Sequence, residues 1–293
     1  MGWRVLVISS RSKLSLKTNA LVIRSGEDTK RIFIDELSAL IIENTGTVVT
    51  AALLELLWQK NITVIFCDNK HNPGAQLIPF YGMRENTSRI RTQLQWNTDT
   101  VDKVWVAIAK EKIRKQAQLL EKFNLPGSEQ LYALREDVDV RDPRNREGNA
   151  ARIYFQSLFG SDFLRSSHCT CNSALDYGYA IILSAFNREI AAAGYLTQIG
   201  IHHCNGANQF NLACDLMEPF RPLVDWEIAQ MVFSDPDELI PDEKHQIAKL
   251  LVQKISINDQ STQIIEAIGI YARSIFAALE RDDPSLIKFY EYE

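Results

Sequence analysis

Two adjacent histidines and two acids spaced three residues apart fall within one short stretch, GIHHCNGANQFNLACDLMEPFRP, residues 200–222. Apolar residues after Asn208 recur at helical spacing, so Asp215 and Glu218 are expected on one face of a helix, with roughly 5–6 Å between their Cβ atoms. Carboxylate oxygens together with one imidazole suit Mg2+ or Mn2+. The alternative is that both acids are solvated, or that they pair with Arg221.

A third acid, Glu147, stands early in a separate predicted helix. Asp142-Pro143 opens this helix, because proline is favoured at the first helical position, and the helix runs to Gly160. Arg144 and Arg146 are among the arginines that crowd around the acid. Such a cluster is typical of a phosphate-binding cradle around a metal ligand. The simpler interpretation is an acid favoured by the helix dipole.

A long helix and a proline-bounded turn must position these residues. Residues 172–194 predict a helix with small and apolar residues on most faces, suited to the centre of a helical domain. Pro219 and Pro222 require the helix after Asp215 to kink or restart, because proline removes a backbone donor and disfavours helical geometry just before it. Glu218 would therefore be held at a backbone irregularity.

The first 78 residues differ in pattern from the rest of the chain. Short runs rich in Val, Ile and Phe, separated by turn residues, predict a β-rich domain with one helix at 48–59. Residues 79–97 are predicted to be a linker. Residues 98–293 are helical in pattern almost throughout, and their acidic end is expected to be loosely ordered. The predicted fold class is α+β, with a small N-terminal β-rich domain followed by a larger all-α domain.

A long basic helix is predicted from Thr98 to about Phe123. Its face could lie along a phosphate backbone, and a solvated helix face is the alternative. The predicted DNA contacts are Lys110, Arg114, Lys115, Arg144 and Arg146. The net charge is −5, with 6 basic and 14 acidic side chains in residues 225–293, so DNA affinity would depend on local contacts.

The composition favours a globular protein of a reducing compartment. The chain has 293 residues, 46% of them hydrophobic, and five cysteines without disulfide-framework spacing. The sequence has neither an apolar run of about 18 residues nor a secretion leader, so we expect a cytoplasmic protein without membrane association. A zinc site would have to combine residues 168–171 with 202–204, but Cys-x-Cys is a weak signal.

The motifs DPRNREGNAARIYFQSLFG and GIHHCNGANQFNLACDLMEPFRP, with the opening GWRVLVIS, resemble the CRISPR-associated integrase of spacer acquisition, Cas one, most closely its type II form. The resemblance covers essentially the whole chain. It implies a dimerising β-rich domain of residues 1–78, a helical catalytic domain of residues 98–293, and a Mg2+ or Mn2+ site. By motif match the catalytic metal ligands are Glu147, His203 and Glu218, with Asp215 and Asn145 in support. Relatives often carry an acid where this chain has Cys214.

The activity that this resemblance implies is that of a metal-dependent DNA endonuclease and integrase of antiviral defence. The 3′-hydroxyl of a foreign DNA fragment would attack a phosphodiester of the CRISPR repeat. Implied partners are DNA, a second copy of the chain, and a dimer of a smaller CRISPR-associated protein, Cas two, that bridges two such dimers. Two alternatives stay open: a metal-dependent nuclease acting on branched DNA or RNA, and a non-catalytic helical scaffold.

Overall fold

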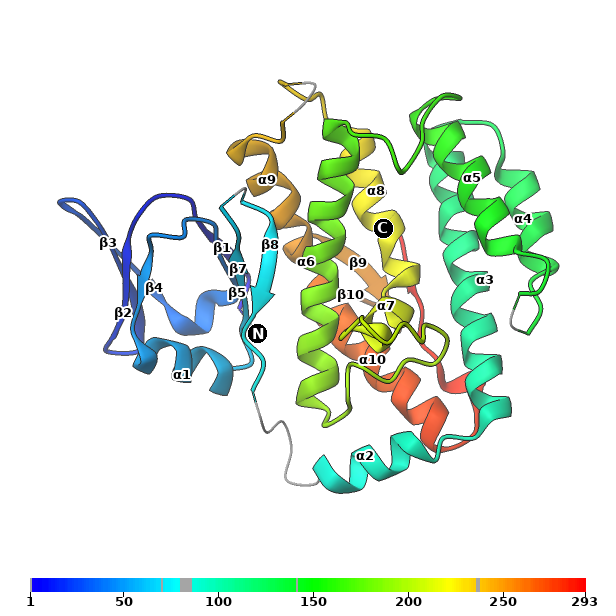
Figure 1. Cartoon of the computed structure of the whole chain (residues 1–293), viewed down its shortest axis with the longest axis horizontal. Helices are drawn as coiled ribbons and strands as arrows, with labels where there is room; N and C mark the ends of the chain where they lie inside the picture. Colours follow the sequence, from blue (N-terminus) through cyan, green and yellow to red (C-terminus); the bar gives the residue numbers. More distant parts are fainter. Residues whose placement is uncertain (1, 70, 80–85, 141, 236–237) are drawn as a thin grey trace.

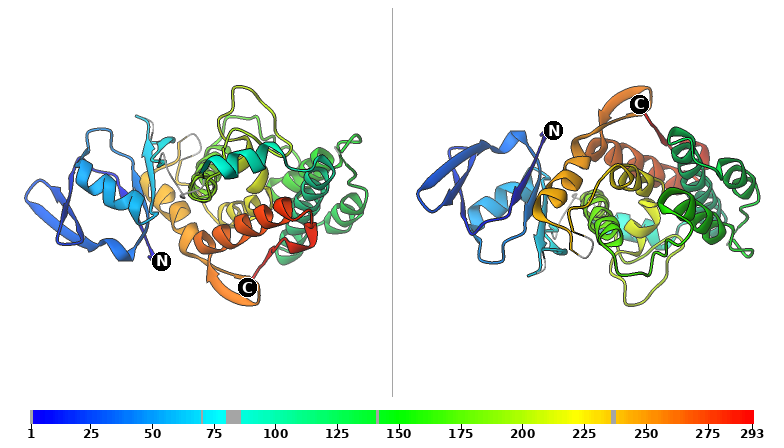
Figure 2. Two further views of the ribbon diagram at one scale, coloured as in Figure 1. Left: turned by 90° about the horizontal axis from the view of Figure 1, so that it is seen from below. Right: turned by 90° about the horizontal axis from the view of Figure 1, so that it is seen from above.

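A computed structural model of the protein describes residues 2–69, 71–79, 86–140, 142–235 and 238–293. A β-rich N-terminal part lies beside a larger helical part, as Figures 1 and 2 show. This arrangement confirms the predicted α+β class. Within the described residues, every helix is too short or too polar to span a lipid bilayer.

The first sheet forms the boundary between the two parts. Its strand order is β1-β5-β7-β8, in which β1, β5 and β7 are parallel and β8 is antiparallel to β7. The strands are β1 (Arg4–Ile8), β5 (Leu37–Ile42), β7 (Thr63–Cys67) and β8 (Pro73–Gln76). Successive side chains of a strand point to opposite faces. Leu40 therefore packs in the core of the β-rich part, whereas Ile41 packs in the core of the helical part.

The second sheet has the order β4-β3-β2-β6, an antiparallel meander to which β6 is added in parallel. Leu53 of α1 packs with Leu14 of β2 and Leu40 of β5, which joins both sheets in one core. The predicted helix begins later than expected, because Val48 and Val49 pair with β2. The elements are β2 (Lys13–Lys17), β3 (Ala20–Ser25), β4 (Asp28–Phe33), η1 (Ile34–Glu36), β6 (Val48–Val49) and α1 (Ala51–Gln59).

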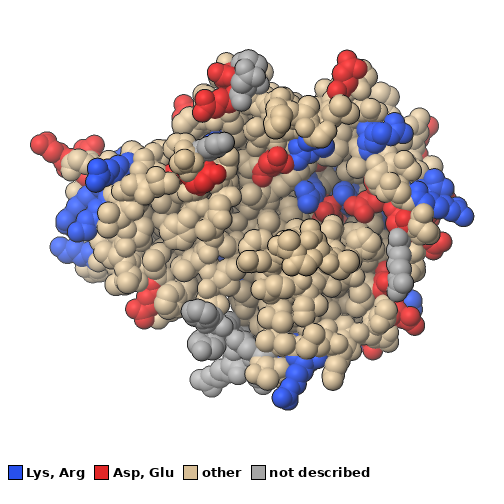
Figure 3. Space-filling model, viewed as in Figure 1, with Lys and Arg blue, Asp and Glu red and all other residues tan. Residues whose placement is uncertain are grey.

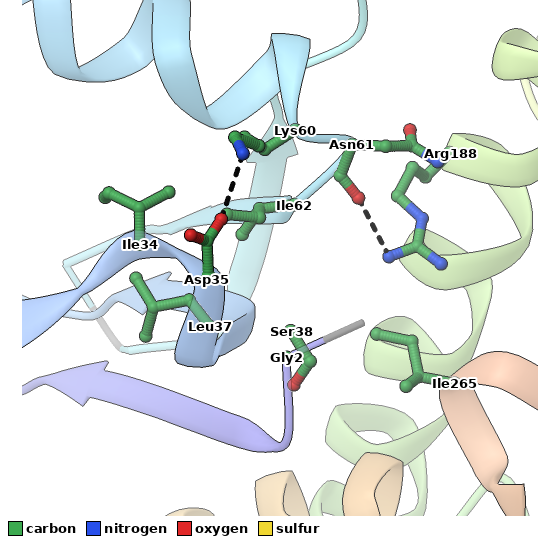
Figure 4. A pocket seen from close by; sticks show the side chains of 10 residues that line it. All are labelled: Gly2, Ile34, Asp35, Leu37, Ser38, Lys60, Asn61, Ile62, Arg188 and Ile265. Carbon is green, nitrogen blue, oxygen red and sulfur yellow. Dashed lines mark hydrogen bonds and ion pairs between the residues drawn. The ribbon is translucent and has the colours of Figure 1, made fainter. Parts of the chain in front are cut away.

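A cavity of about 210 Å³ lies on the boundary between the two parts (Figure 4). Asp35 and Lys60, whose charged atoms are 3.0 Å apart, line it from the β-rich part. Arg188 lines it from the helical part and donates to the carbonyl of Asn61 at 3.2 Å. The acids and the histidine predicted for the metal site are not among its lining residues.

Part of the predicted linker, residues 79–97, is helical. Residues 80–85 lie outside the described residues, and α2 (Asn86–Leu94) follows them. The buried side chain of Gln93 donates to the carbonyls of Leu196 and Ile199, both at 3.0 Å, and accepts from the N–H of Leu196 at 2.8 Å. These bonds fix α2 to the loop that precedes the histidine pair.

In the helical part, α6 contacts the helices α7, α8, α9 and α10, and lies on the side that faces the first sheet, where it contacts β7 and β8 (Figure 1). Gly178 of α6 allows a close approach to α8, because a Cβ at this position would lie 2.4 Å from the side chain of Val224. The elements are α3 (Thr98–Lys122), α4 (Ser128–Glu136), α5 (Arg146–Phe159), α6 (Thr170–Ala192), α7 (Asn211–Leu216), η2 (Glu218–Phe220), α8 (Arg221–Ala229), α9 (Pro241–Ala248), η3 (Lys249–Val252), α10 (Ile264–Glu280) and η4 (Pro284–Leu286).

The helical part also contains a small sheet, so the prediction of an all-α domain is wrong in this respect. β9 (Lys254–Ile257) pairs antiparallel with both β10 (Gln260–Gln263) and β11 (Tyr290–Glu291). The expectation of a loosely ordered C-terminus is also wrong. Tyr290 is fully buried, and its hydroxyl donates to the carbonyl of Pro219 at 3.0 Å. The C-terminal segment is thereby tied to the residue that follows Glu218.

Candidate active site

Asp215, near the end of α7, organises the loop that carries the histidine pair. Its fully buried carboxylate accepts the backbone N–H groups of Ile201 at 2.7 Å and of His202 and His203, both at 3.0 Å. A buried carboxylate is tolerated only when its oxygens are hydrogen-bonded, and these donors meet that requirement. Gly200 makes the close approach possible, since a Cβ there would lie 2.6 Å from Oδ2 of Asp215.

The two adjacent histidines have different environments. Nδ1 of His203 lies 2.6 Å from Oδ1 of Asp215. In the neutral imidazole, the Nδ1 proton then faces the carboxylate and Nε2 is left for a ligand. The hydrogen bond to Asp215 raises the pKa of His203, against the opposing effect of burial. His202 instead stacks on Trp105, with ring centroids 4.0 Å apart and planes 3° from parallel. The geometry therefore favours His203 as the ligand.

Glu147 lies in the first turn of α5, and Asp142 caps this turn. The carboxylate of Asp142 accepts the backbone N–H groups of Arg146 and Glu147, both at 2.8 Å. The helix begins at Arg146 and not at Asp142-Pro143 as predicted. Asp142 instead lies before the helix and accepts N–H groups of its first turn, which have no acceptor within the helix. Asn145, predicted as a supporting residue, precedes the helix with a φ of 50°, a left-handed conformation that asparagine tolerates.

Glu218 is the first residue of η2 and is only 4% exposed. The predicted common helix face with Asp215 is not formed, since α7 ends at Leu216 and the backbone changes to a 3-10 turn. Nε of Arg221 lies 3.0 Å from Oε1 of Glu218. Burial raises the pKa of Glu218, but the positive charges of Arg221 and Lys112 outweigh it and lower the pKa to about 2. Solvation of both acids is therefore excluded, and the pairing with Arg221 is present.

Lys112 of α3 connects the two glutamates. Its Nζ lies 2.6 Å from Oε1 of Glu147 and 2.6 Å from Oε2 of Glu218. Burial lowers the pKa of Lys112, but the two carboxylates outweigh burial and raise it. This role of Lys112 was not predicted from the sequence, although the sequence contains a signal for it. Trp105 and Ile108 are buried at helical spacing on α3, and position 112 continues that face, where a lysine needs a charged partner.

Three separate segments thus bring Glu147, His203 and Glu218 toward one place. Both glutamates contribute to the raised pKa of His203, after the larger effect of Asp215. Two carboxylates and an imidazole suit Mg2+ or Mn2+. In addition, Oε2 of Glu218 is buried without a hydrogen bond, although the ammonium of Lys112 lies 2.6 Å from it. The chemistry of these donors therefore fits a divalent cation.

Although these side chains approach one another, they do not form a set of metal ligands in this structure. Among the residues that the structure describes, no three His, Cys, Asp or Glu side chains are grouped to hold a metal ion. This finding also covers the described residues of the zinc alternative, 168–171 and 202–204. Between Glu147 and Glu218, the ammonium of Lys112 occupies the place of a cation.

Two of the predicted DNA contacts have structural partners instead. Lys115 is fully buried, with its Nζ 2.9 Å from a carboxylate oxygen of Glu291 and 4.4 Å from the ring centroid of Tyr290. Arg114 pairs with Glu111 at 2.7 Å and also with Glu291. In this structure both side chains attach the C-terminal segment to α3. Lys115 is too buried to reach DNA here, whereas contact of Arg114 with DNA stays a prediction.

The other three predicted contacts lie nearer the solvent. Lys110 is half-buried and donates to the carbonyl of Glu136 at 3.4 Å. Arg146 pairs with Asp137 at 3.1 Å, and Arg144 is exposed just before α5. Figure 3 shows that side chains of both signs gather on the side of the molecule formed by α3, α4 and α5, beside a broad uncharged area over α6. Arg144 is therefore the best placed of the predicted contacts to meet a phosphate.

Comparison with known proteins agrees with this fold and these motifs. The family model described as CRISPR associated protein Cas1 matches residues 5–236. The chain is 32% identical over 294 residues to the CRISPR-associated endonuclease Cas1 of Neisseria meningitidis serogroup C (strain 8013). The alignment covers 99% of this chain and 97% of that protein. The chain therefore belongs to the Cas1 family, and the resemblance read from the motifs is confirmed.

Two solved structures share the fold at lower sequence identity. A casposase bound to integration product aligns with a TM-score of 0.77 and 16% identity, over 96% of this chain and 91% of that chain. A Cas6-RT-Cas1–Cas2 complex aligns with a TM-score of 0.73 and 19% identity, over 97% of this chain but only 36% of that chain. Both likenesses extend over nearly the whole of the present chain.

Proposed function

We propose that this protein is a metal-dependent DNA endonuclease and integrase of CRISPR adaptation. It joins the 3′-hydroxyl ends of short foreign DNA fragments to the CRISPR repeat by transesterification. The observation that carries the proposal is the approach of Glu147 and Glu218 to a single cation, the ammonium of Lys112, at 2.6 Å each. Family membership supports it, since the relative from Neisseria meningitidis is named an endonuclease.

The proposed cofactor is Mg2+ or Mn2+, held by Glu147, Glu218 and Nε2 of His203. When bound, such an ion polarises a phosphoryl oxygen and stabilises the attacking and leaving oxygens of an in-line displacement. The chain supplies no nucleophile, because the 3′-hydroxyl of one DNA molecule attacks the phosphodiester of another. Water in place of that hydroxyl gives hydrolysis, which is the endonuclease reaction.

The neighbouring side chains orient the ligands and attract the substrate. Asp215 fixes the ring of His203 in the tautomer that directs Nε2 away from the carboxylate. Arg221 holds Oε1 of Glu218 and keeps that carboxylate ionised. Arg144, exposed three residues before Glu147, is proposed to bind a phosphate of the DNA near the site.

The proposed partners follow from the family. One solved relative is a Cas6-RT-Cas1–Cas2 complex, and another is a casposase bound to integration product. We therefore propose that this chain binds the DNA fragment and the repeat, forms a homodimer, and assembles with a dimer of Cas2 that bridges two such dimers.

The test is a strand-transfer assay with a labelled DNA fragment and a repeat-containing plasmid, in Mn2+ or in EDTA. Glu147→Gln and Glu218→Gln should each remove strand transfer and branched-DNA cleavage, because each removes an anionic ligand. Asp162→Asn, which changes an exposed acid, serves as the matched control. An active Glu218→Gln variant would contradict the proposal. Cleavage of a matched RNA in preference to DNA would favour the RNA nuclease instead.

A further inference from the structure

Lys112 occupies the point between the two glutamates that the proposed cation would need. Building on the proposed function, we infer that Lys112 is a tethered counter-ion that competes with the divalent cation and thereby sets the metal affinity of the site. In the metal-free protein Lys112 holds Glu147 and Glu218 together. The cation binds between these carboxylates only when the ammonium has withdrawn.

The distances show that Lys112 and a bound cation would compete for the same two oxygens. The ammonium nitrogen lies 2.6 Å from Oε1 of Glu147 and 2.6 Å from Oε2 of Glu218. A Mg2+ ion bound to the same two oxygens would lie about 2.0–2.1 Å from each. An ion on the side of the oxygen pair where the ammonium lies would overlap with it, and on either side two positive charges would lie within a few Å of each other. One of the two cations must leave.

Electrostatics explains why the lysine is present in the metal-free state. Glu218 is almost fully buried, and Arg221 pairs with its Oε1, so its Oε2 depends on Lys112 for a positive neighbour. Glu147 has Lys112 as its ion-pair partner. Without the lysine, two carboxylates would face each other across a poorly solvated gap, where like charges repel strongly. Lys112 therefore keeps the ligands in place until the metal ion arrives.

The lysine is also able to leave. Its side chain keeps 12% of its surface exposed and that of Glu147 keeps 23%, so the ion pair is not sealed from solvent. A lysine ammonium is carried on a flexible stem of four carbons, which allows withdrawal without a change in the helix. The apparent metal affinity equals the intrinsic affinity multiplied by the fraction of molecules in which the lysine has withdrawn.

The experiment is a calorimetric titration of the purified full chain with Mn2+. Lys112→Gln and Lys112→Met remove the competing charge, whereas Lys112→Arg keeps it. Lys103→Gln, an exposed lysine on the same helix, is the matched control for charge alone. Glu218→Gln shows whether the titrated ion binds at this site. We expect the dissociation constant for Mn2+ to be at least about tenfold lower for Lys112→Gln and Lys112→Met than for the wild type. In both variants no ammonium lies between the carboxylates, so every molecule can bind the ion.

Melting temperatures give a second readout that does not depend on activity. Without metal, both neutral variants should melt below the wild type, and they should gain more than the wild type from added Mn2+. Lys112→Arg and Lys103→Gln should bind Mn2+ within about threefold of the wild type. If the wild type binds Mn2+ and both neutral variants bind it equally well or more weakly, the role inferred for Lys112 is wrong but the metal site stands. Absence of Mn2+ binding in the wild type and in both neutral variants would overturn the metal site itself, and this inference with it.

Discussion

Nδ1 of His203 lies 2.6 Å from Oδ1 of Asp215, a fully buried carboxylate that also accepts three backbone N–H groups from the same loop. Asp215 thus determines both the fold of the loop and the orientation of the ring. We predict that Asp215→Asn lowers the free energy of unfolding by about 3 kcal/mol, because an amide offers one acceptor oxygen where two are used. Urea denaturation of the metal-free protein measures this.

The matched control for that change is Asp162→Asn, at an exposed position. It should alter the free energy of unfolding by less than about 0.5 kcal/mol. Asp215→Asn should also weaken Mn2+ binding, since the ring of His203 loses the acceptor that orients it. If Asp215→Asn is as stable as the wild type, the carboxylate does not hold the loop.

A second prediction distinguishes exposed basic side chains from buried ones. Arg144→Gln should reduce the slope of log affinity against log salt by about 0.9 on duplex DNA, the value for one phosphate contact. Lys115→Met should leave the slope unchanged, because Lys115 is fully buried against the C-terminal segment. Binding measured by fluorescence anisotropy over a salt series gives both slopes. A shallower slope for Lys115→Met would mean that the C-terminal segment leaves α3 when DNA binds.

The contacts that the sequence predicts well are local in sequence or carried by family motifs. Periodicity and turn residues predict the β-rich start and the long helices, and they also mark the stretch with His203 and Glu218. The partners of Lys112 and Lys115 are not, because Glu147 lies 35 residues from Lys112 and Glu291 lies 176 residues from Lys115. Whether a lysine on a basic helix is solvated or buried depends on such distant partners, and helical spacing alone does not reveal them.

A third prediction concerns the homodimer. The β-rich part exposes several large apolar side chains, among them Phe33, which is 62% exposed at the end of the edge strand β4. Edge strands and exposed apolar side chains favour association. Phe33→Asp should shift the protein from dimer to monomer in sedimentation velocity at micromolar concentration. Val232→Asp, at a 93% exposed valine of the helical part, should leave the dimer intact. The opposite pattern would place the interface on the helical part.

The last prediction concerns Asp225, a buried acid of α8 that accepts hydrogen bonds from the hydroxyls of Tyr154 and Tyr179. Burial raises the pKa of Asp225 to about 6, against the opposing effect of both hydrogen bonds. The carboxyl of an unfolded chain has a pKa of ~3.9. The folded protein therefore binds this proton more tightly than the unfolded chain does. The resulting stabilisation is complete below the unfolded pKa and is lost as the pH rises through about 6.

Asp225→Asn removes this titration, so the test compares the two proteins at two pH values. The free energy of unfolding of the wild type minus that of Asp225→Asn should fall by about 2 kcal/mol between about pH 4.5 and 7.5. Loss of other contacts in the variant contributes equally at both pH values and cancels in this comparison. Asp162→Asn, at an exposed position, should show a constant difference from the wild type. A constant difference for Asp225→Asn as well would mean that Asp225 is ionised in the folded protein throughout this range.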